Sequence, residues 1–172
     1  FRYCVDEYWN IPHFEKMLCD NAQLISVFSI SDFLNKNTKN KFLVQQTIDY
    51  WLELSQKNHQ LFPASVDADN KDGEGAYYVF KKSEIHENLN EQEQNYCKSY
   101  FNMTQQMLWE NNWHLHRTTY DNSEKAKKII FKLKKIRENK SFPAIDNKAI
   151  CSWNCMMVNG LLDASIAYRN IE

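Results

Sequence analysis

Apolar side chains recur at helical spacing in two neighbouring stretches near the start of the chain. The first stretch predicts a helix from about residue 12 to residue 35, with Pro12 at the first helical position, where a missing N–H is tolerated. The second predicts a helix over residues 41–56, with Val44, Ile48 and Trp51 among its buried residues. Because the connector 37–40 is short and polar, the two helices are expected to form an antiparallel hairpin.

The pattern changes after the second helix. Residues 61–69 and 76–80 are short, extended-looking runs on either side of the sequence NKDGEG, which contains two of the three glycines. This arrangement predicts a β-hairpin or a structured loop inserted among helices. Ser83 is the expected N-cap of a short helix over 84–89, and residues 91–117 show no clear periodicity.

Two more helices are predicted in the last third of the chain. Ser123 precedes a basic amphipathic helix that runs to about Asn139, and a loop containing Pro143 follows. The last helix is expected from Ser152, as its N-cap, to Arg169. The predicted fold class is therefore mainly α, with antiparallel helical hairpins, one short β-hairpin insertion and no internal domain boundary over residues 1–172.

Composition narrows the class of protein. The 172 residues carry a formal net charge of −1, and 43% are hydrophobic, so neither nucleic acid nor a membrane is an expected partner. Only 3 Gly and 3 Pro are present, which favours helices over a turn-rich β fold. The five cysteines have no paired spacing and indicate free thiols, and hence a cytoplasmic location. The chain begins with Phe1 and is expected to be an internal segment of a longer protein.

The sequence WNIPHFEKML places His13 and Glu15 at the predicted start of the first helix. Unpaired N–H groups in a first helical turn favour anionic partners and a neutral imidazole, which can act as a base. His13 and Glu15 are therefore candidate catalytic residues. The alternative is that both side chains only cap or solvate the helix start.

Acidic residues are concentrated between Asp67 and Glu74. In an extended segment Asp67 and Asp69 point to the same side, so Asp67 is a candidate catalytic residue and Asp69 and Glu74 are candidate substrate ligands. The spacing does not match an EF-hand, and no metal or other cofactor is expected. A solvent-exposed acidic turn is the alternative.

Trp153 and Asn154 fall in the first turn of the last predicted helix. An aromatic face beside an amide is typical of sites that hold a sugar ring, so both residues are candidate substrate ligands. A tryptophan that simply belongs to the core is the alternative for Trp153.

Three stretches together resemble one known family. RYCVDEYWNIPHFEKMLCDNAQL, SVDADNKDGEGAYYVFKKSEI and FPAIDNKAICSWNCMMVNGLLDAS occur here in the order seen in the spermatogenesis-associated, thioredoxin-domain-containing proteins. The resemblance implies part of an (α/α)6 toroid of the six-hairpin glycosidase and N-acylglucosamine 2-epimerase type. The thioredoxin-like domain of that family and the hairpins that would complete the toroid are absent from this sequence.

The resemblance also suggests a function. In such toroids the inner helices begin around one central cavity, which favours a pocket lined by His13, Asp67 and Trp153. We expect a carbohydrate-active or carbohydrate-binding protein. It would be either a sugar epimerase or isomerase, in which His13 transfers a proton with Glu15 or Asp67 as its partner, or a glycoside hydrolase that uses the carboxylates of Asp67 and Glu74. Its expected partners are a sugar-like ligand, the remaining toroid hairpins and the thioredoxin-like domain. The alternative is a non-catalytic binding module that accompanies the redox domain.

Overall fold

The computed structural model describes residues 1–103, 108–117, 121 and 123–169. The chain divides into two compact units. Unit 1 consists of Phe1–Arg2, Glu15–Asp67 and Ala144–Glu172, and unit 2 consists of Tyr3–Phe14 and Ala68–Pro143. The described part of the chain is mainly helical with small antiparallel sheets, which confirms the predicted class.

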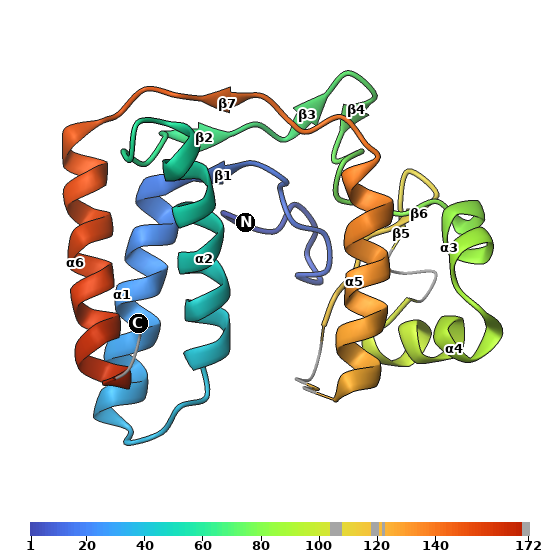
Figure 1. The fold of residues 1–172 in the computed structure, drawn as a ribbon, viewed down its shortest axis with the longest axis horizontal. Coiled ribbons are helices and arrows are strands. Elements are labelled where there is room, and N and C mark those ends of the chain that lie inside the picture. The colour runs from blue at the N-terminus through green and yellow to red at the C-terminus, as the bar shows by residue number, and fades with distance from the viewer. Residues whose placement is uncertain (104–107, 118–120, 122, 170–172) are drawn as a thin grey trace. The chain divides into compact units, whose positions relative to one another are not determined.

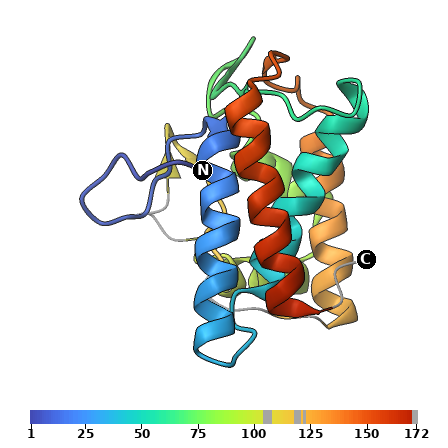
Figure 2. The same ribbon diagram turned by 90° about the vertical axis from the view of Figure 1, so that its left-hand side faces the viewer.

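Unit 1 is built on three helices that lie side by side: α1 (Leu18–Leu34), α2 (Lys41–Lys57) and α6 (Cys151–Tyr168) (Figures 1 and 2). Their shared core includes Trp51, which is 0% exposed, together with Leu18, Ala22, Ile25, Val44, Ile48, Met157 and Ala164. The bounds of α2 agree with the predicted helix to within one residue. Burial of one face of each helix is the main stabilising contribution in this unit.

Three short strands lie next to these helices in the sequence: one before α1, one after α2 and one before α6. β1 (Lys16–Met17), β2 (Ser65–Val66) and β7 (Ile145–Asp146) form an antiparallel sheet in the order β1-β2-β7. α1 follows β1 directly, and α6 follows β7 after a connecting segment, as the blue and red ribbons of Figure 1 show. The sheet was not predicted, because strands of two residues have no readable alternation.

The turn between α1 and α2 confirms the predicted helical hairpin. Asp32 is 1% exposed, and its carboxylate accepts hydrogen bonds from the backbone N–H of Asn40 and from Asn40 Nδ2, both at 2.8 Å. It also accepts from the Tyr168 hydroxyl of α6 at 2.9 Å. One buried side chain therefore connects the end of α1, the start of α2 and the last turn of α6.

The predicted start of the first helix is wrong. Pro12 lies in an isolated bridge opposite Cys4, and α1 begins only at Leu18. The reason is long-range pairing: the His13 N–H donates to the Tyr3 carbonyl at 2.9 Å, and the Leu18 N–H donates to the Ala64 carbonyl at 2.9 Å. In a helix that began at Pro12, the Leu18 N–H would donate to the Phe14 carbonyl, so its bond to Ala64 replaces a helical bond, and the bond of His13 to Tyr3 holds the preceding segment against another part of the chain.

Ser152 is not the N-cap of the last helix. α6 starts at Cys151, and its first helical hydrogen bond runs from the Asn154 N–H to the Ile150 carbonyl at 3.0 Å. Ile150 therefore occupies the capping position, although its side chain cannot accept a hydrogen bond. Trp153 and Asn154 remain in the first turn, as predicted.

Unit 2 contains the β-hairpin predicted around NKDGEG. β3 (Asp69–Asn70) pairs antiparallel with β4 (Gly73–Glu74), and β5 (Leu108–Trp109) pairs with β6 (Asn112–Trp113). The predicted extended run 76–80 is wrong, since only Phe80 pairs there, in a bridge to Trp113. The chain turns at Gly75, whose φ is +70° and where a Cβ would lie 2.5 Å from the Phe14 ring.

The helices of unit 2 are α3 (Lys82–Asn88), α4 (Glu91–Tyr100) and α5 (Glu124–Glu138). Ser123 caps α5 as predicted, because its Oγ accepts from the Ala126 N–H at 3.1 Å. Ser83 lies inside α3 and does not cap it. Asn90 and Glu93 form a reciprocal capping box at the start of α4, a local signal that the sequence analysis missed.

Within the described residues, none of the helices combines the length and the apolar character that crossing a membrane requires.

Candidate functional site

Two predicted catalytic residues, Glu15 and Asp67, flank the paired strands β1 and β2 of unit 1. Lys16 pairs with Val66 and Met17 with Ser65, so Glu15 directly precedes β1 and Asp67 directly follows β2 at the same end of this antiparallel pair; the same register extended by one residue would set the two opposite each other. Residues opposite each other in an antiparallel pair have Cβ atoms about 5 Å apart. The Asp67 N–H also donates to the Ala144 carbonyl at 2.9 Å, next to β7. Glu15 is half-buried and Asp67 is exposed.

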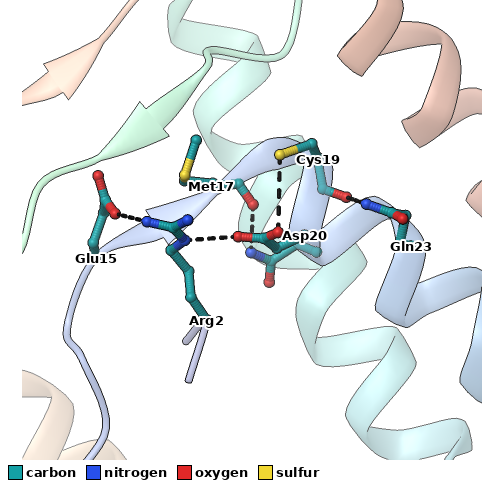
Figure 3. A network of polar contacts seen from close by, with 7 residues as sticks. Arg2, Glu15, Met17, Cys19, Asp20 and Gln23 are labelled. Carbon is teal, nitrogen blue, oxygen red and sulfur yellow. Dashed lines mark hydrogen bonds and ion pairs between the residues drawn. The ribbon is translucent and has the colours of Figure 1, made fainter. Parts of the chain in front are cut away.

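Glu15 belongs to an ion-pair network centred on Arg2 (Figure 3). Arg2 Nη1 lies 2.6 Å from Glu15 Oε2, and Arg2 Nε lies 2.8 Å from Asp20 Oδ2. A hydrogen bond to Glu15, and to a smaller extent one to Asp20, raises the pKa of the Arg2 guanidinium. The arginine therefore holds two carboxylates in fixed positions at the start of α1.

Sequence reasoning missed Arg2 and Asp20. Arg2 is 13 residues from Glu15 and 18 from Asp20, so no helical or strand spacing relates them. Asp20 lies in the first turn of α1, where the positive end of the helix favours an acidic side chain. This local preference was the one signal for Asp20 in the sequence.

The remaining polar contacts at this end of α1 hold the helix start in place. Asn21 Nδ2 donates to the Met17 carbonyl at 2.7 Å, and Gln23 Nε2 donates to the Cys19 carbonyl at 3.0 Å (Figure 3). Burial raises the pKa of the Cys19 thiol, whose Sγ lies 3.9 Å from Asp20 Oδ1. A thiol with a raised pKa is a poor nucleophile near neutral pH.

Asn154 is hydrogen-bonded to the chain that leads into β2. Its Oδ1 accepts from the Phe62 N–H at 3.0 Å, and its Nδ2 donates to the carbonyls of Phe62 and Ile150, both at 3.1 Å. The side chain thus ties this segment to the first turn of α6. Trp153 is half-buried and packs against the core of unit 1. The substrate-binding roles of both residues stay predictions.

His13, Asp69 and Glu74 belong to unit 2. The His13 ring stacks on Tyr3 with 4.9 Å between ring centroids and 11° between planes. His13 precedes α1 by several residues, so the argument from the positive end of a helix does not apply to it. Asp69 and Glu74 lie directly opposite each other in β3–β4, and both are exposed. That His13 shares a cavity with Asp67 and Trp153 stays a prediction.

Among the described residues, no group of three or more His, Cys, Asp or Glu side chains has a geometry that could hold a metal ion. His114 is 5% exposed, and burial lowers its pKa. The neutral form of this imidazole is therefore favoured in the folded chain.

The architecture is that of a mainly helical protein with small antiparallel sheets, and Glu15 and Asp67 are candidate site residues at one end of its three-helix unit. The chain is 26% identical to an uncharacterized protein of Caenorhabditis elegans over 201 aligned positions, which cover 95% of this chain and 27% of that protein. It is 33% identical over 96 positions to mouse spermatogenesis-associated protein 20, and 32% identical to the human protein. Each of these two matches covers 52% of this chain and 12% of the relative.

These similarities support the relationship to the spermatogenesis-associated protein family that the sequence motifs suggested. The matched region is 27% of the length of the worm relative and 12% of the length of the mouse relative. The chain therefore spans only part of the relatives that it matches. No family model matches the chain.

Proposed function

We propose that unit 1 carries part of a binding site for a sugar-like ligand, and that its carboxylates transfer a proton in the epimerisation or isomerisation of that ligand. The supporting observation is that Glu15 directly precedes β1 and Asp67 directly follows β2, at the same end of this antiparallel strand pair. Two carboxyl groups at neighbouring positions can remove a proton from a substrate carbon and return one to it.

The two carboxylates differ in their surroundings, which suggests different roles. Glu15 is paired with Arg2 and is therefore suited to orient a ligand hydroxyl. Asp67 is exposed and is the better candidate for the proton transfer itself. Trp153 would offer an aromatic face to the ring, since it lies in the first turn of α6.

We further propose that the chain is part of an (α/α)6 toroid. The support is that α1 and α6 lie side by side and that each follows a strand of the same sheet, as expected of neighbouring inner helices of a toroid. In this proposal further hairpins complete the ring, and a thioredoxin-like domain belongs to the same protein.

Substituting Glu15→Gln in the full-length protein is expected to abolish stabilisation by sugars, because Glu15 is the carboxylate proposed to orient the ligand. Ligand at about 100 times its Kd adds about 2.7 kcal/mol to the stability of the folded state, which is readily measured as a rise in Tm. Hexoses and N-acetylhexosamines are suitable probes. Asp72→Asn, at the exposed tip of the β3–β4 hairpin, is the matched control and should keep the full ligand response.

Proton transfer has its own readout. An epimerase or isomerase incorporates deuterium from D2O into the sugar carbon that it deprotonates, and nuclear magnetic resonance detects this exchange. If a sugar binds but no deuterium is incorporated into it, the site binds the sugar without transferring a proton. If no sugar changes the Tm and the thioredoxin-like domain captures a protein partner, the non-catalytic alternative replaces this proposal.

A further inference from the structure

Helix α5 of unit 2 carries a phenylalanine at the centre of its exposed face. The buried face of the helix consists of Ala126, Ile129, Leu133 and Ile136. By helical periodicity Phe131 lies on the opposite side, and it is 59% exposed. A single exposed apolar residue is common at a protein surface, so the residues around Phe131 decide what it can do.

Four lysines surround Phe131 on the same face of α5. Lys127 and Lys128 lie one turn before it, and Lys134 and Lys135 lie one turn after it. All four lysines are exposed. At about 1.5 Å per residue, each pair is displaced from Phe131 by roughly 5 Å along the helix axis. We call Phe131 and these four lysines the α5 surface.

Two ion pairs at the ends of the helix neutralise part of the positive charge of the α5 surface. Lys127 Nζ lies 2.8 Å from Glu124 Oε1, and Lys135 Nζ lies 2.9 Å from Glu138 Oε2. Among the described residues, the other two lysines of the surface form no ion pair. Four lysines and two glutamates leave this face of the helix with a net charge of +2.

The ring of Phe131 contacts one lysine of the surface. Lys135 Nζ lies 5.5 Å from the centre of the ring. A cation–π contact at an exposed site is weak, and this one leaves more than half of Phe131 exposed. The ring is therefore accessible to a further apolar group, and positive charges that carboxylates complement lie on both sides of it.

We propose that the α5 surface binds an acidic segment of a partner protein, in which carboxylates lie on both sides of an apolar side chain. The apolar side chain covers Phe131, and the carboxylates pair with the lysines one turn before and one turn after it. Residues three and four apart share one face of a helix, so a helical partner segment repeats at the same spacing as the α5 surface. This inference does not depend on the proposed sugar site.

The amount of charge favours an acidic segment over nucleic acid or a membrane. Proteins that bind DNA through its phosphates commonly make about six to ten phosphate contacts, and lipid-binding basic clusters contain about four to eight Lys or Arg. The α5 surface has a net charge of only +2. Two further lysines of the helix are engaged within unit 2, since Lys132 pairs with Glu93 at 2.8 Å and Lys125 lies over the Tyr96 ring.

Fluorescence anisotropy with a labelled synthetic peptide tests the proposal in the full-length protein. The leucine probe is a short peptide with a central leucine and glutamates on both sides, and the serine probe has serine in place of that leucine. We expect the leucine probe to bind at least roughly tenfold more tightly than the serine probe, because only leucine covers Phe131. Raising the salt concentration from about 0.1 M to about 1 M shortens the Debye length from about 10 Å to about 3 Å and should weaken the binding of both probes.

Two variants locate the binding to the α5 surface. The double variant with Lys128→Glu and Lys134→Glu should weaken the binding of the leucine probe at least roughly tenfold, because like charges then face each other. Phe131→Ala should reduce the binding of the leucine probe to that of the serine probe. Lys98→Glu and Phe33→Ala are the matched controls, since Lys98 is exposed on α4 and Phe33 is 51% exposed on α1. Both controls should bind the leucine probe as the unmodified protein does.

The outcomes separate an acidic partner from the alternatives. Weaker binding in both α5 variants, with unchanged binding in both controls, supports the proposal. Binding that both α5 variants retain overturns it, because the peptide then binds elsewhere. If the peptide does not bind, but oligouridylate or phosphatidylserine vesicles bind and lose affinity in both α5 variants, a polyanion replaces the acidic segment. If none of these probes binds, the α5 surface is only a solvated helix face and the proposal is wrong. Should a variant fail to fold, the comparison of the two probes on the unmodified protein still decides.

Discussion

Substituting Asp32→Ala should lower the free energy of unfolding by roughly 3 to 5 kcal/mol. The buried carboxylate accepts three hydrogen bonds, from the Asn40 N–H, from Asn40 Nδ2 and from the Tyr168 hydroxyl. Alanine would leave all three donors without this acceptor, two of them on the half-buried Asn40 and one on the buried Tyr168. Urea denaturation followed by far-UV circular dichroism measures the change.

Further variants separate the contributions that the individual hydrogen bonds to Asp32 make to the free energy of unfolding. Tyr168→Phe removes one donor together with its hydroxyl, so a smaller loss of about 1 kcal/mol is expected. Asp49→Ala is the matched control, because Asp49 is exposed on α2 and its carboxylate accepts from Gln45 Nε2. It should change stability by less than about 0.5 kcal/mol. Equal effects of Asp32→Ala and Asp49→Ala would contradict the role given to the buried carboxylate.

Substituting Gly160→Leu should destabilise the protein by about 3 kcal/mol, near the upper end of the effects of overpacking. Gly160 lies on α6 where the helix touches α1, and a Cβ there would be 2.7 Å from the backbone carbonyl oxygen of Ala22. A backbone atom cannot rotate away, so α1 and α6 would have to separate. Thermal unfolding followed by circular dichroism tests this.

Gly160→Ala distinguishes close packing from helix propensity. In an exposed helix, replacing glycine by alanine stabilises by up to about 1 kcal/mol. Here the contact with Ala22 should reverse the sign, and a loss of about 1 to 2 kcal/mol is expected. Asn159→Ala, at the exposed neighbouring position, should be nearly neutral. A stabilised Gly160→Ala variant would show that α1 and α6 are not in close contact at this point.

Much of the helical framework could be read from local patterns. The periodicity of Val44, Ile48 and Trp51 located α2, and Ser123 located the start of α5, because both signals involve residues within one or two turns. The capping box of Asn90 and Glu93 was readable in the same way but was overlooked. The start of α1 was not readable, since Leu18 bonds to Ala64 in another part of the chain.

The candidate site was less accessible to sequence reasoning. Glu15 and Asp67 were both predicted as site residues, but only the pairing of β1 with β2 brings them to the same end of one strand pair. The chain gave no sign that Arg2 binds Glu15, or that Asn154 binds the backbone of Phe62. These contacts join residues that are distant along the chain.

The sequence by itself determined the mainly helical class, the α1–α2 hairpin, the hairpin at NKDGEG and the similarity to one protein family. Each depends on neighbouring residues, whose side chains interact within a turn or a strand pair. The tertiary structure alone decided where α1 begins, that Glu15 and Asp67 flank one strand pair, and that Phe131 is exposed on α5. These features depend on backbone and side-chain partners far away in the sequence, and a residue's own neighbours do not encode such partners.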